Sequence, residues 1–264
     1  MSATRKQIHA AVTLPLMVVA LAIALLLPGR AASAECTQGN CLDGYGVFVF
    51  TSGEKYEGQF SGGNPHGTGT IHYPNGDFYA GELVGGFANG KGTLSFADGQ
   101  KYVGDFEDGK RHGMGTNTWP SGDKYVGQSV EGTMQGVGTY YYVNGDRYEG
   151  QFADGQFNGK GVYYYKNGDK YVGEFKGSLF HGTGAMDYAG GSRYEGRFEN
   201  DKRNGIGTLT TEDGRQYKGT YLDDVMATGE MNKDKTDMEA AANTANAENK
   251  DTPFAGTSQW PPVP

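Results

Sequence analysis

The chain has 264 residues, of which 45 are glycine, and only 36% are hydrophobic, too few for the core of a compact globular domain. Its formal net charge of -8 at pH 7 argues against attraction to nucleic acid or anionic lipid. Composition alone leans toward disorder, but all 18 tyrosines lie between Tyr45 and Tyr221 at fixed spacings that a disordered segment has no reason to keep. We therefore expect one ordered repeat region between unlike ends.

Residues 1–34 are typical of a secretory signal peptide. A basic pair precedes an apolar stretch over residues 10–27, and residues 32–34 (Ala-Ser-Ala) form a small-residue cleavage site. We expect cleavage before Glu35 and export to the periplasm or out of the cell. The alternative is an uncleaved membrane anchor formed by residues 10–27, because this run is close to the shortest that spans a bilayer. Cleavage removes three basic residues and no acid, so the net charge falls to -11.

Cys36 and Cys41 are the only cysteines in the chain. In an oxidising compartment, a pair this close in sequence closes a small loop, here residues 35–41. A metal or redox site is the alternative, but no histidine or second cysteine pair lies nearby in sequence. The spacing therefore predicts a disulfide that restrains the start of the repeat region.

The central region, residues 42–225, repeats a 23-residue unit without insertion or deletion. Each unit opens with a tyrosine followed two residues later by a glycine, and further glycines recur 11, 13 and 20 residues after the tyrosine. Self-similarity at such a period marks a repeat array. The signature pairs are Tyr56 and Gly58, Tyr79 and Gly81, Tyr102 and Gly104, Tyr125 and Gly127, Tyr148 and Gly150, Tyr171 and Gly173, Tyr194 and Gly196, and Tyr217 and Gly219.

Each unit contains two strand-like runs. In the first, Tyr-x-Gly-x-Phe, alternation places the tyrosine, glycine and phenylalanine on one face. The second run ends near an Asn-Gly-Asp turn, as at residues 75–77, which joins it to the next tyrosine as a hairpin. The predicted fold is all-β: an elongated, single-layer antiparallel β-meander of 23-residue hairpins, with no second layer.

A row of aromatic residues lies 17 positions after the tyrosines and is the candidate binding surface. If these rings are open to solvent, they would stack on the sugar rings of an envelope glycan; if they are buried, the array is a scaffold. The row comprises Tyr73, Phe96, Trp119, Tyr142, Tyr165 and Tyr188.

Charged residues flank the tyrosines on the opposite face and predict a solvated charge ladder. Basic residues precede the tyrosines and acids follow one or three positions after them. The basic members are Lys55, Lys101, Lys124, Arg147, Lys170 and Arg193, and the acidic members are Glu57, Glu82, Asp105, Glu149, Glu174 and Glu195.

The chain changes character after the repeats. Residues 226–264 are rich in Ala, Asn, Glu and Lys and predict a disordered tail, with a short helix over residues 238–245 as an alternative. The tail ends in a proline-rich segment, residues 260–264, which is a weak polyproline recognition signal.

The pattern Tyr-x-Gly-x-Phe, His-Gly-x-Gly and Asn-Gly-Asp resembles the MORN (membrane occupation and recognition nexus) repeat over about residues 42–221. This resemblance implies an extended β-meander that acts as a scaffold or interaction module, in a family also linked to phospholipid binding and self-association. Leu83 and Ser129 replace the usual phenylalanine, and Asn117 and Thr211 replace apolar or aromatic residues. Because Asn117 and Ser129 are close in the meander, we expect a thinner or bent sheet there.

No pattern for catalysis or metal binding emerges. His66, His112 and His181 precede turn glycines in separate units, too far apart to share a metal. Residues 85–92 mimic a phosphate-binding loop without the following Ser or Thr. We therefore expect no enzyme activity and no cofactor, and interpret the chain as an exported scaffold for an unidentified protein partner, with glycan or phospholipid binding as alternatives and nucleic acid excluded.

Overall fold

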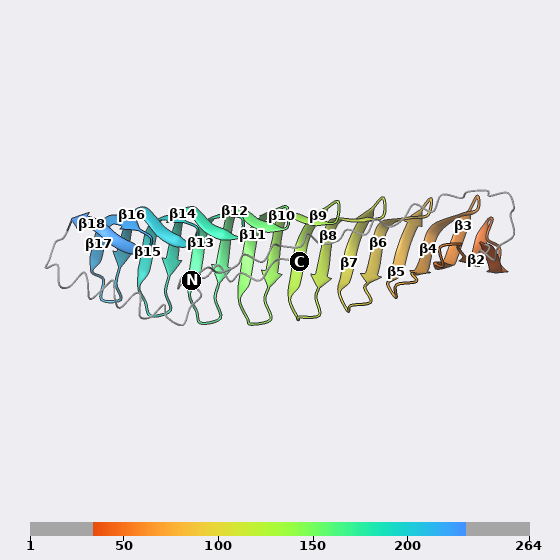
Figure 1. Cartoon of the computed structure of the whole chain (residues 1–264), viewed down its shortest axis with the longest axis horizontal. Coiled ribbons are helices and arrows are strands. Elements are labelled where there is room, and N and C mark those ends of the chain that lie inside the picture. The colour runs from red at the N-terminus through yellow and green to blue at the C-terminus, as the bar shows by residue number, and fades with distance from the viewer. Residues whose placement is uncertain (1–33, 231–264) are drawn as a thin grey trace, which may run out of the picture. The chain divides into compact units, whose positions relative to one another are not determined.

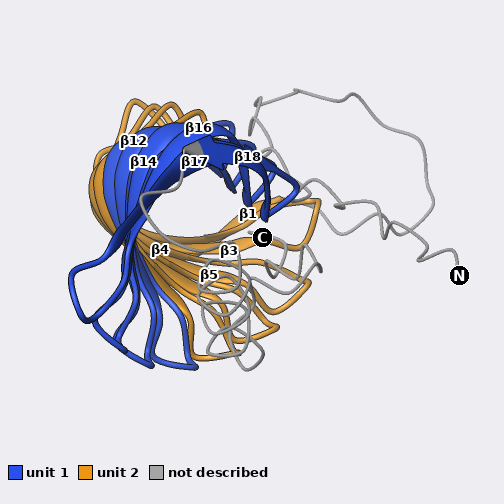
Figure 2. Cartoon of the chain, turned by 90° about the vertical axis from the view of Figure 1, so that its left-hand side faces the viewer, with its two compact units in different colours: residues 1–9, 135–264 blue, residues 10–134 orange. Residues whose placement is uncertain are grey.

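The computed structural model describes residues 34–230, where the regular elements are all strands (Figure 1). Within this range the chain forms two compact units. The first in chain order is residues 34–134, orange in Figure 2 and labelled unit 2 there, and the second is residues 135–230, blue and labelled unit 1. In each unit, consecutive strands pair antiparallel with one another. The predictions of an all-β meander and of a 23-residue repeat are confirmed. Residues 1–33 of the predicted signal peptide, including the alternative anchor, lie outside the described residues, as does the chain after residue 230.

The first unit is built from nine strands. They are β1 (Glu35–Gly39), β2 (Gly44–Val49), β3 (Lys55–Ser61), β4 (Asn64–His72), β5 (Phe78–Val84), β6 (Phe87–Ser95), β7 (Lys101–Glu107), β8 (Lys110–Thr118) and β9 (Lys124–Val130).

The second unit holds the remaining strands of the described range, the first of which begins two residues before the unit boundary. They are β10 (Thr133–Tyr141), β11 (Arg147–Ala153), β12 (Gln156–Tyr164), β13 (Lys170–Lys176), β14 (Leu179–Asp187), β15 (Arg193–Glu199), β16 (Lys202–Thr210), β17 (Gln216–Leu222) and β18 (Val225–Glu230).

Two kinds of turn alternate along the meander. The Asn-Gly-Asp segments turn the chain as predicted, through a three-residue loop: the Gly76 N–H donates to the Tyr73 carbonyl at 3.0 Å, and Gly76 has φ 92°. The turns at the opposite end contain two residues, both with positive φ, such as Asp108 at 46° and Gly109 at 78°. These are the tight turns that match the twist of paired strands, at positions that the sequence analysis did not single out.

A bulge curves each hairpin that begins with a tyrosine. Between β3 and β4, Gly58 pairs with Gly69 and Phe60 with Pro65, so three residues of β4 lie opposite the single residue Gln59. The same break in register recurs in later 23-residue repeats. Extra residues on one strand bend the pair, and the strands of each unit are accordingly curved (Figure 2).

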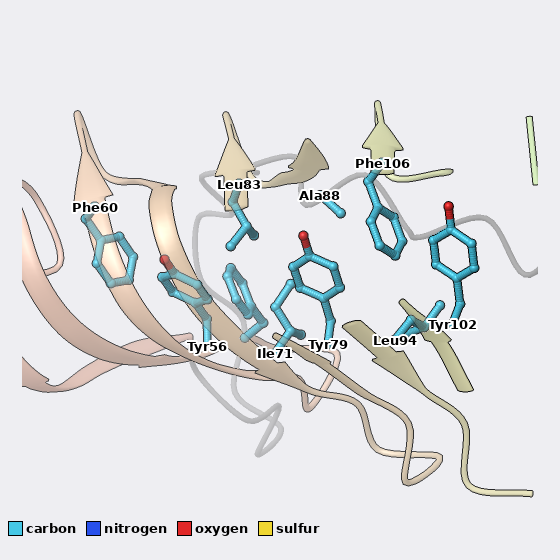
Figure 3. Packing of buried hydrophobic residues seen from close by; sticks show 10 residues of the cluster. Tyr56, Phe60, Ile71, Tyr79, Leu83, Ala88, Leu94, Tyr102 and Phe106 are labelled. Atoms are coloured by element: carbon cyan, nitrogen blue, oxygen red, sulfur yellow. The ribbon is translucent and has the colours of Figure 1, made fainter. Parts of the chain in front are cut away.

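The curved strands enclose the core of the first unit. Tyr56 and Tyr79 are 0% exposed, which a flat layer of strands could not achieve, since one face of each ring would meet water. Figure 3 shows the tyrosine rings and the side chains of Phe60, Leu83 and Phe106 pointing toward one another. Within each unit the described strands form one sheet, as predicted; beyond the bulge, the strands of this sheet bend over and cover their own rings.

Pairs of glycines lie beneath the rings of Tyr56, Tyr79, Tyr102, Tyr148, Tyr171 and Tyr194. Gly58 faces Gly69 on the next strand, and a Cβ atom on either one would collide with the ring of Tyr56. The Tyr56 hydroxyl donates to the carbonyl of Gln59 at 2.7 Å, so it stays bonded although the ring is buried. The same bond joins Tyr79 to Glu82, Tyr102 to Asp105, Tyr125 to Gln128, Tyr148 to Gln151, Tyr171 to Glu174 and Tyr194 to Arg197.

The ends of the array differ from the predicted boundaries. Residues 226–230, which were expected to begin a disordered tail, belong to β18, because Gly219 still finds a facing glycine in Gly229. At the other end, the predicted cysteine loop over residues 35–41 is largely strand β1, which pairs with β2. Cys36 and Cys41 form the predicted disulfide, which ties β1 to the turn that follows it.

Candidate functional site

The aromatic row that was the candidate binding surface belongs to the core. Trp119, Tyr142 and Tyr188 are each 8% exposed and Tyr165 is 7% exposed. Tyr73 and Phe96 are partly buried and pack against the core of the first unit. The choice of this row as the candidate binding surface is therefore corrected, and of the two alternatives the buried one, which favours a scaffold, applies. Alternation along a strand shows which residues share a face, but not whether the curved strands cover that face.

A core position nine residues after each tyrosine was not predicted from the sequence. In the second unit, Phe157 stacks on Tyr148 with ring centroids 3.8 Å apart and planes 11° apart, and Phe180 stacks on Tyr171 in the same way. No constant residue type marks this position, because other repeats have proline, alanine, arginine or methionine there. Its burial follows only from the bulge, which turns this part of the strand over the tyrosine.

Two arginines occupy this core position and bring polar partners with them. Arg111 donates to the side-chain oxygen of Asn117 at 3.1 Å and to the carbonyl of Gly132 at 2.6 Å. Asn117, the residue that departs from the apolar pattern, is thus the partner of a partly buried cation. The expected thinning near Asn117 and Ser129 is not seen, since β8 and β9 pair through this stretch without a break in register.

The outer face of the sheet carries the charges. Glu57 lies 3.7 Å from Lys55, Glu149 lies 3.1 Å from Arg147, and Glu195 lies 2.7 Å from Arg193. The predicted charge ladder therefore exists for acids one position after the tyrosine. Exposed pairs of this kind contribute little to stability.

Acids three positions after the tyrosine have a different role. Glu82 accepts a hydrogen bond from the backbone N–H of Lys91 at 3.0 Å, and Asp105 accepts one from Met114 at 3.1 Å. These bonds satisfy backbone donors that the bulge removes from the strand ladder. Lys91, which also donates to Asp105 at 2.5 Å, lowers the pKa of that carboxyl. Asp105 therefore belongs to the predicted charge ladder through its pair with Lys91. Glu82, Asp105 and Glu174 also hold the bulges, a role that was not predicted.

The three predicted loop histidines lie in strands instead. His66, His112 and His181 fall within β4, β8 and β14, opposite the bulge residue. Their carbonyl oxygens lie within 3.3 to 3.5 Å of the hydroxyls of the signature tyrosines. Within residues 34–230, no three His, Cys, Asp or Glu side chains gather as metal ligands would.

Two shallow hollows open on the outer face above rows of paired glycines. The first, of about 580 Å³, has Gly58, Gly69 and Gly81 as its floor. The second, of about 500 Å³, lies in the second unit above Gly150, Gly161 and Gly173, so the two occupy equivalent positions four repeats apart. Their other lining residues are Tyr45, Glu57, Thr68, Thr70, His72 and Phe78 in the first, and Glu149, Lys160, Val162, Val172, Glu174 and Thr183 in the second.

Across residues 34–230, no helix has the length and apolar character needed to cross a membrane. The family model of the MORN repeat matches the chain in eight consecutive segments. These are residues 42–55, 56–78, 79–101, 102–124, 125–147, 148–170, 171–193 and 194–214.

The chain belongs to the MORN repeat family. Seven of the eight matched segments begin at a signature tyrosine, so the repeat of the family coincides with the hairpin and bulge described above. The resemblance inferred from the tyrosine and glycine spacing is confirmed. No curated protein matches this MORN repeat protein.

Solved β-sheet domains of centriole proteins are similar to it. The TCP10c domain of Drosophila melanogaster Sas-4 is 14% identical, with a TM-score of 0.36 and coverage of 59% of this chain and 93% of that one. The Drosophila melanogaster Sas-4 TCP domain in complex with a proline-rich motif of Ana2 is 13% identical, with a TM-score of 0.31 and coverage of 75% of this chain and 99% of that one. A mutant of the TCP10 domain of Danio rerio CPAP is 12% identical, with a TM-score of 0.37 and coverage of 67% of this chain and 90% of that one. At these values nothing about the function of this chain follows from the likeness.

Proposed function

We propose that this MORN repeat protein is a non-catalytic scaffold that binds a partner protein on the outer face of its sheet. The observation that carries the proposal is the difference between the two faces. The inner face is filled by packed rings such as Tyr56 and Tyr148, both 0% exposed. The outer face presents the same strand positions in every repeat, in steps of about 9.6 Å for two strands.

The chemistry of the hollows supports binding. Glycine, threonine and valine supply much of their lining, and the ionisable groups there are solvent-facing side chains such as Glu57 and Lys160. Catalytic sites instead bring nucleophiles, acids and bases together in a recess that excludes water. A shallow surface of this composition is suited to contact with another chain.

A matched set of surface variants tests this proposal. Val103 and Val172 lie on the outer face and are 47% and 42% exposed, so Val103→Glu with Val172→Glu changes that face without touching the core. The control, Leu42→Glu with Val143→Glu, adds the same charges to exposed positions in turns, outside the strands of the sheet.

Chemical cross-linking of each tagged variant in cells, followed by mass spectrometry, reports its partners. We expect the first pair of substitutions to lose cross-links that the control pair retains. Equal cross-linking by both pairs would show that the outer face is not where partners bind.

We further propose that the chain acts outside the cytoplasm after cleavage before Glu35. Two observations support export: the signal-type sequence of residues 1–34, and the disulfide between Cys36 and Cys41, a bond that persists mainly in oxidising compartments. Fusion to a reporter enzyme that is active only after export tests this, with a deletion of residues 2–34 as control. N-terminal sequencing of the exported protein distinguishes cleavage from an anchor formed by residues 10–27.

The alternative ligands have less support. Glycan binding rested on open rings, and the aromatic row is covered. A net charge of -11 after cleavage does not favour anionic phospholipid. Vesicle flotation with and without anionic lipid tests the membrane alternative directly, and light scattering of the purified chain tests self-association.

A further inference from the structure

We propose that the hollow of the first unit binds a proline-rich segment of a partner protein in the polyproline II conformation. In this arrangement the segment lies across the strands, along the row of paired glycines. The inference rests on the proposed scaffold function and specifies the chemistry of its partner. Four independent features of the hollow support it.

The first feature is the length of the repeat. Two strands at about 4.8 Å spacing advance the surface by about 9.6 Å per repeat. A polyproline II helix advances about 3.1 Å per residue with three residues per turn, or about 9.3 Å per turn. A segment lying across the strands therefore presents the same edge to each successive repeat. In an extended strand, side chains on one edge recur at about 6.8 Å, which does not match the length of the repeat.

The second feature is the state of the backbone in the floor. Gly58 and Gly81 both pair with Gly69, so the strands beneath the hollow already have neighbours on both sides. A ligand that adds a strand needs an open sheet edge, which this location is not. Polyproline II has no internal hydrogen bonds and needs no partner strand, and proline has no N–H to satisfy.

The third feature is the aromatic lining. Tyr45 is 60% exposed, and its hydroxyl donates to Glu57 at 2.8 Å, which fixes the ring at the hollow. The rings of His72 and Phe78, 4.8 Å apart, also line it. Aromatic-lined grooves are how proteins recognise proline-rich segments.

The fourth feature is charge. Residues 35–134 contain twelve Asp and Glu against six Lys and Arg, and Glu57 stands in the hollow itself. A partner segment that carries lysine or arginine between its prolines is complementary to this surface. The proposed ligand is therefore a basic, proline-rich segment with one cation per turn.

Fluorescence anisotropy with two labelled peptides tests the proposal on the mature chain, residues 35–264. One peptide is four repeats of Lys-Pro-Pro; the other is four repeats of Lys-Gly-Gly, which has the same charge without the polyproline II preference. At about 0.15 M salt we expect the proline peptide to bind at least about tenfold more tightly. Equal binding of the two peptides, or no binding of either, overturns the proposal.

Three single variants locate the site. Tyr45→Ala and Phe78→Ala should each weaken binding of the proline peptide by about tenfold, because they remove aromatic walls of the hollow. Val84→Ala, at an exposed residue of β5 outside the hollow, should leave binding unchanged. Circular dichroism of each variant checks that the fold is retained; if Tyr45→Ala and Phe78→Ala fold and still bind fully, the hollow is not the site.

A third peptide identifies the source of the ligand. Residues 252–264 of the chain itself contain four prolines but no lysine or arginine. Tighter binding of this peptide than of the Lys-Pro-Pro peptide would make the chain's own end the occupant and overturn the proposal of a separate partner. If no proline peptide binds while the Val103 and Val172 variants still lose cross-links, the scaffold function stands and this inference falls.

Discussion

Arg203 and Asp224 form a buried ion pair that joins β16 to the turn before β18. The guanidinium Nε lies 3.1 Å from the Asp224 carboxylate, a second nitrogen donates to the Asp224 carbonyl at 2.9 Å, and Arg203 is 3% exposed. Asp224→Asn keeps a residue that tolerates the local φ of 71° but removes the charge that balances the cation. We expect a loss of about 2 kcal/mol in the free energy of unfolding, measured by urea denaturation.

The control for this prediction comes from the repeat itself. Arg203 stands where Phe157 and Phe180 stand in earlier repeats, so Arg203→Phe replaces the cation by the stacked ring of those units. Replacing a buried charge by a well-packed apolar group is often neutral or stabilising. If Asp224→Asn and Arg203→Phe destabilise equally, the pair is not what holds this turn.

Buried tyrosines predict an alkaline unfolding transition. Burial raises the pKa of Tyr56 and of Tyr102 to about 12 from an ordinary value of 10.0. Between these values the unfolded chain releases tyrosine protons that the folded chain keeps, so stability is fully present below pH 10 and falls as pH rises toward 12. We expect phenolate absorbance to appear together with loss of circular dichroism. Gradual ionisation from about pH 10 with the fold intact would contradict the burial.

The glycines beneath the rings should tolerate no side chain. A Cβ on Gly58 would lie 2.6 Å from the Cα of Gly69 and would collide with the hydroxyl of Tyr56. We expect Gly58→Ala to lower the free energy of unfolding by about 1–3 kcal/mol. Gly62→Asn is the matched control: φ there is 55°, a later repeat places Asn200 at the equivalent turn position, and a change within about 0.5 kcal/mol is expected.

The disulfide should protect one strand. Replacing both Cys36 and Cys41 by serine removes the cross-link between β1 and the following turn, with a cost of about 2 kcal/mol for so small a loop. Hydrogen exchange should then become fast in β1, while β2 keeps its protection because it still pairs with β3. Unchanged exchange in β1 would mean that strand pairing alone holds that end.

Much of the fold is predictable because the constraints repeat. Tyr56 and Gly58 share one face by strand alternation, and a 23-residue phase kept over eight tyrosines leaves little choice but a meander. The cysteine spacing likewise predicts the disulfide. These predictions depend on which residues lie side by side, and strand geometry alone determines that.

The bulge is what the sequence did not reveal. Gln59 lies opposite three residues of β4, and from this follow the cover over the tyrosines, the buried position of Phe157 and the backbone role of Glu82. No single residue type marks it: glutamine, glutamate and aspartate all fill the position of Gln59. The turn at Asp108 and Gly109 was not predicted for the same reason, because other repeats have Gly-Gly, Glu-Gly or Asn-Asp in place of that pair.

Tyrosine rings such as Tyr56 pack against one glycine of their own strand and one of the next strand. This packing limits how the gene can change length. Duplicating or losing 23 codons leaves the stacked tyrosine rings over their glycine pairs, so the product stays foldable and gains or loses one repeat. A gain of 22 or 24 would set a tyrosine against a side chain where a bare backbone is needed. Arrays of this kind should therefore vary among descendants in whole steps.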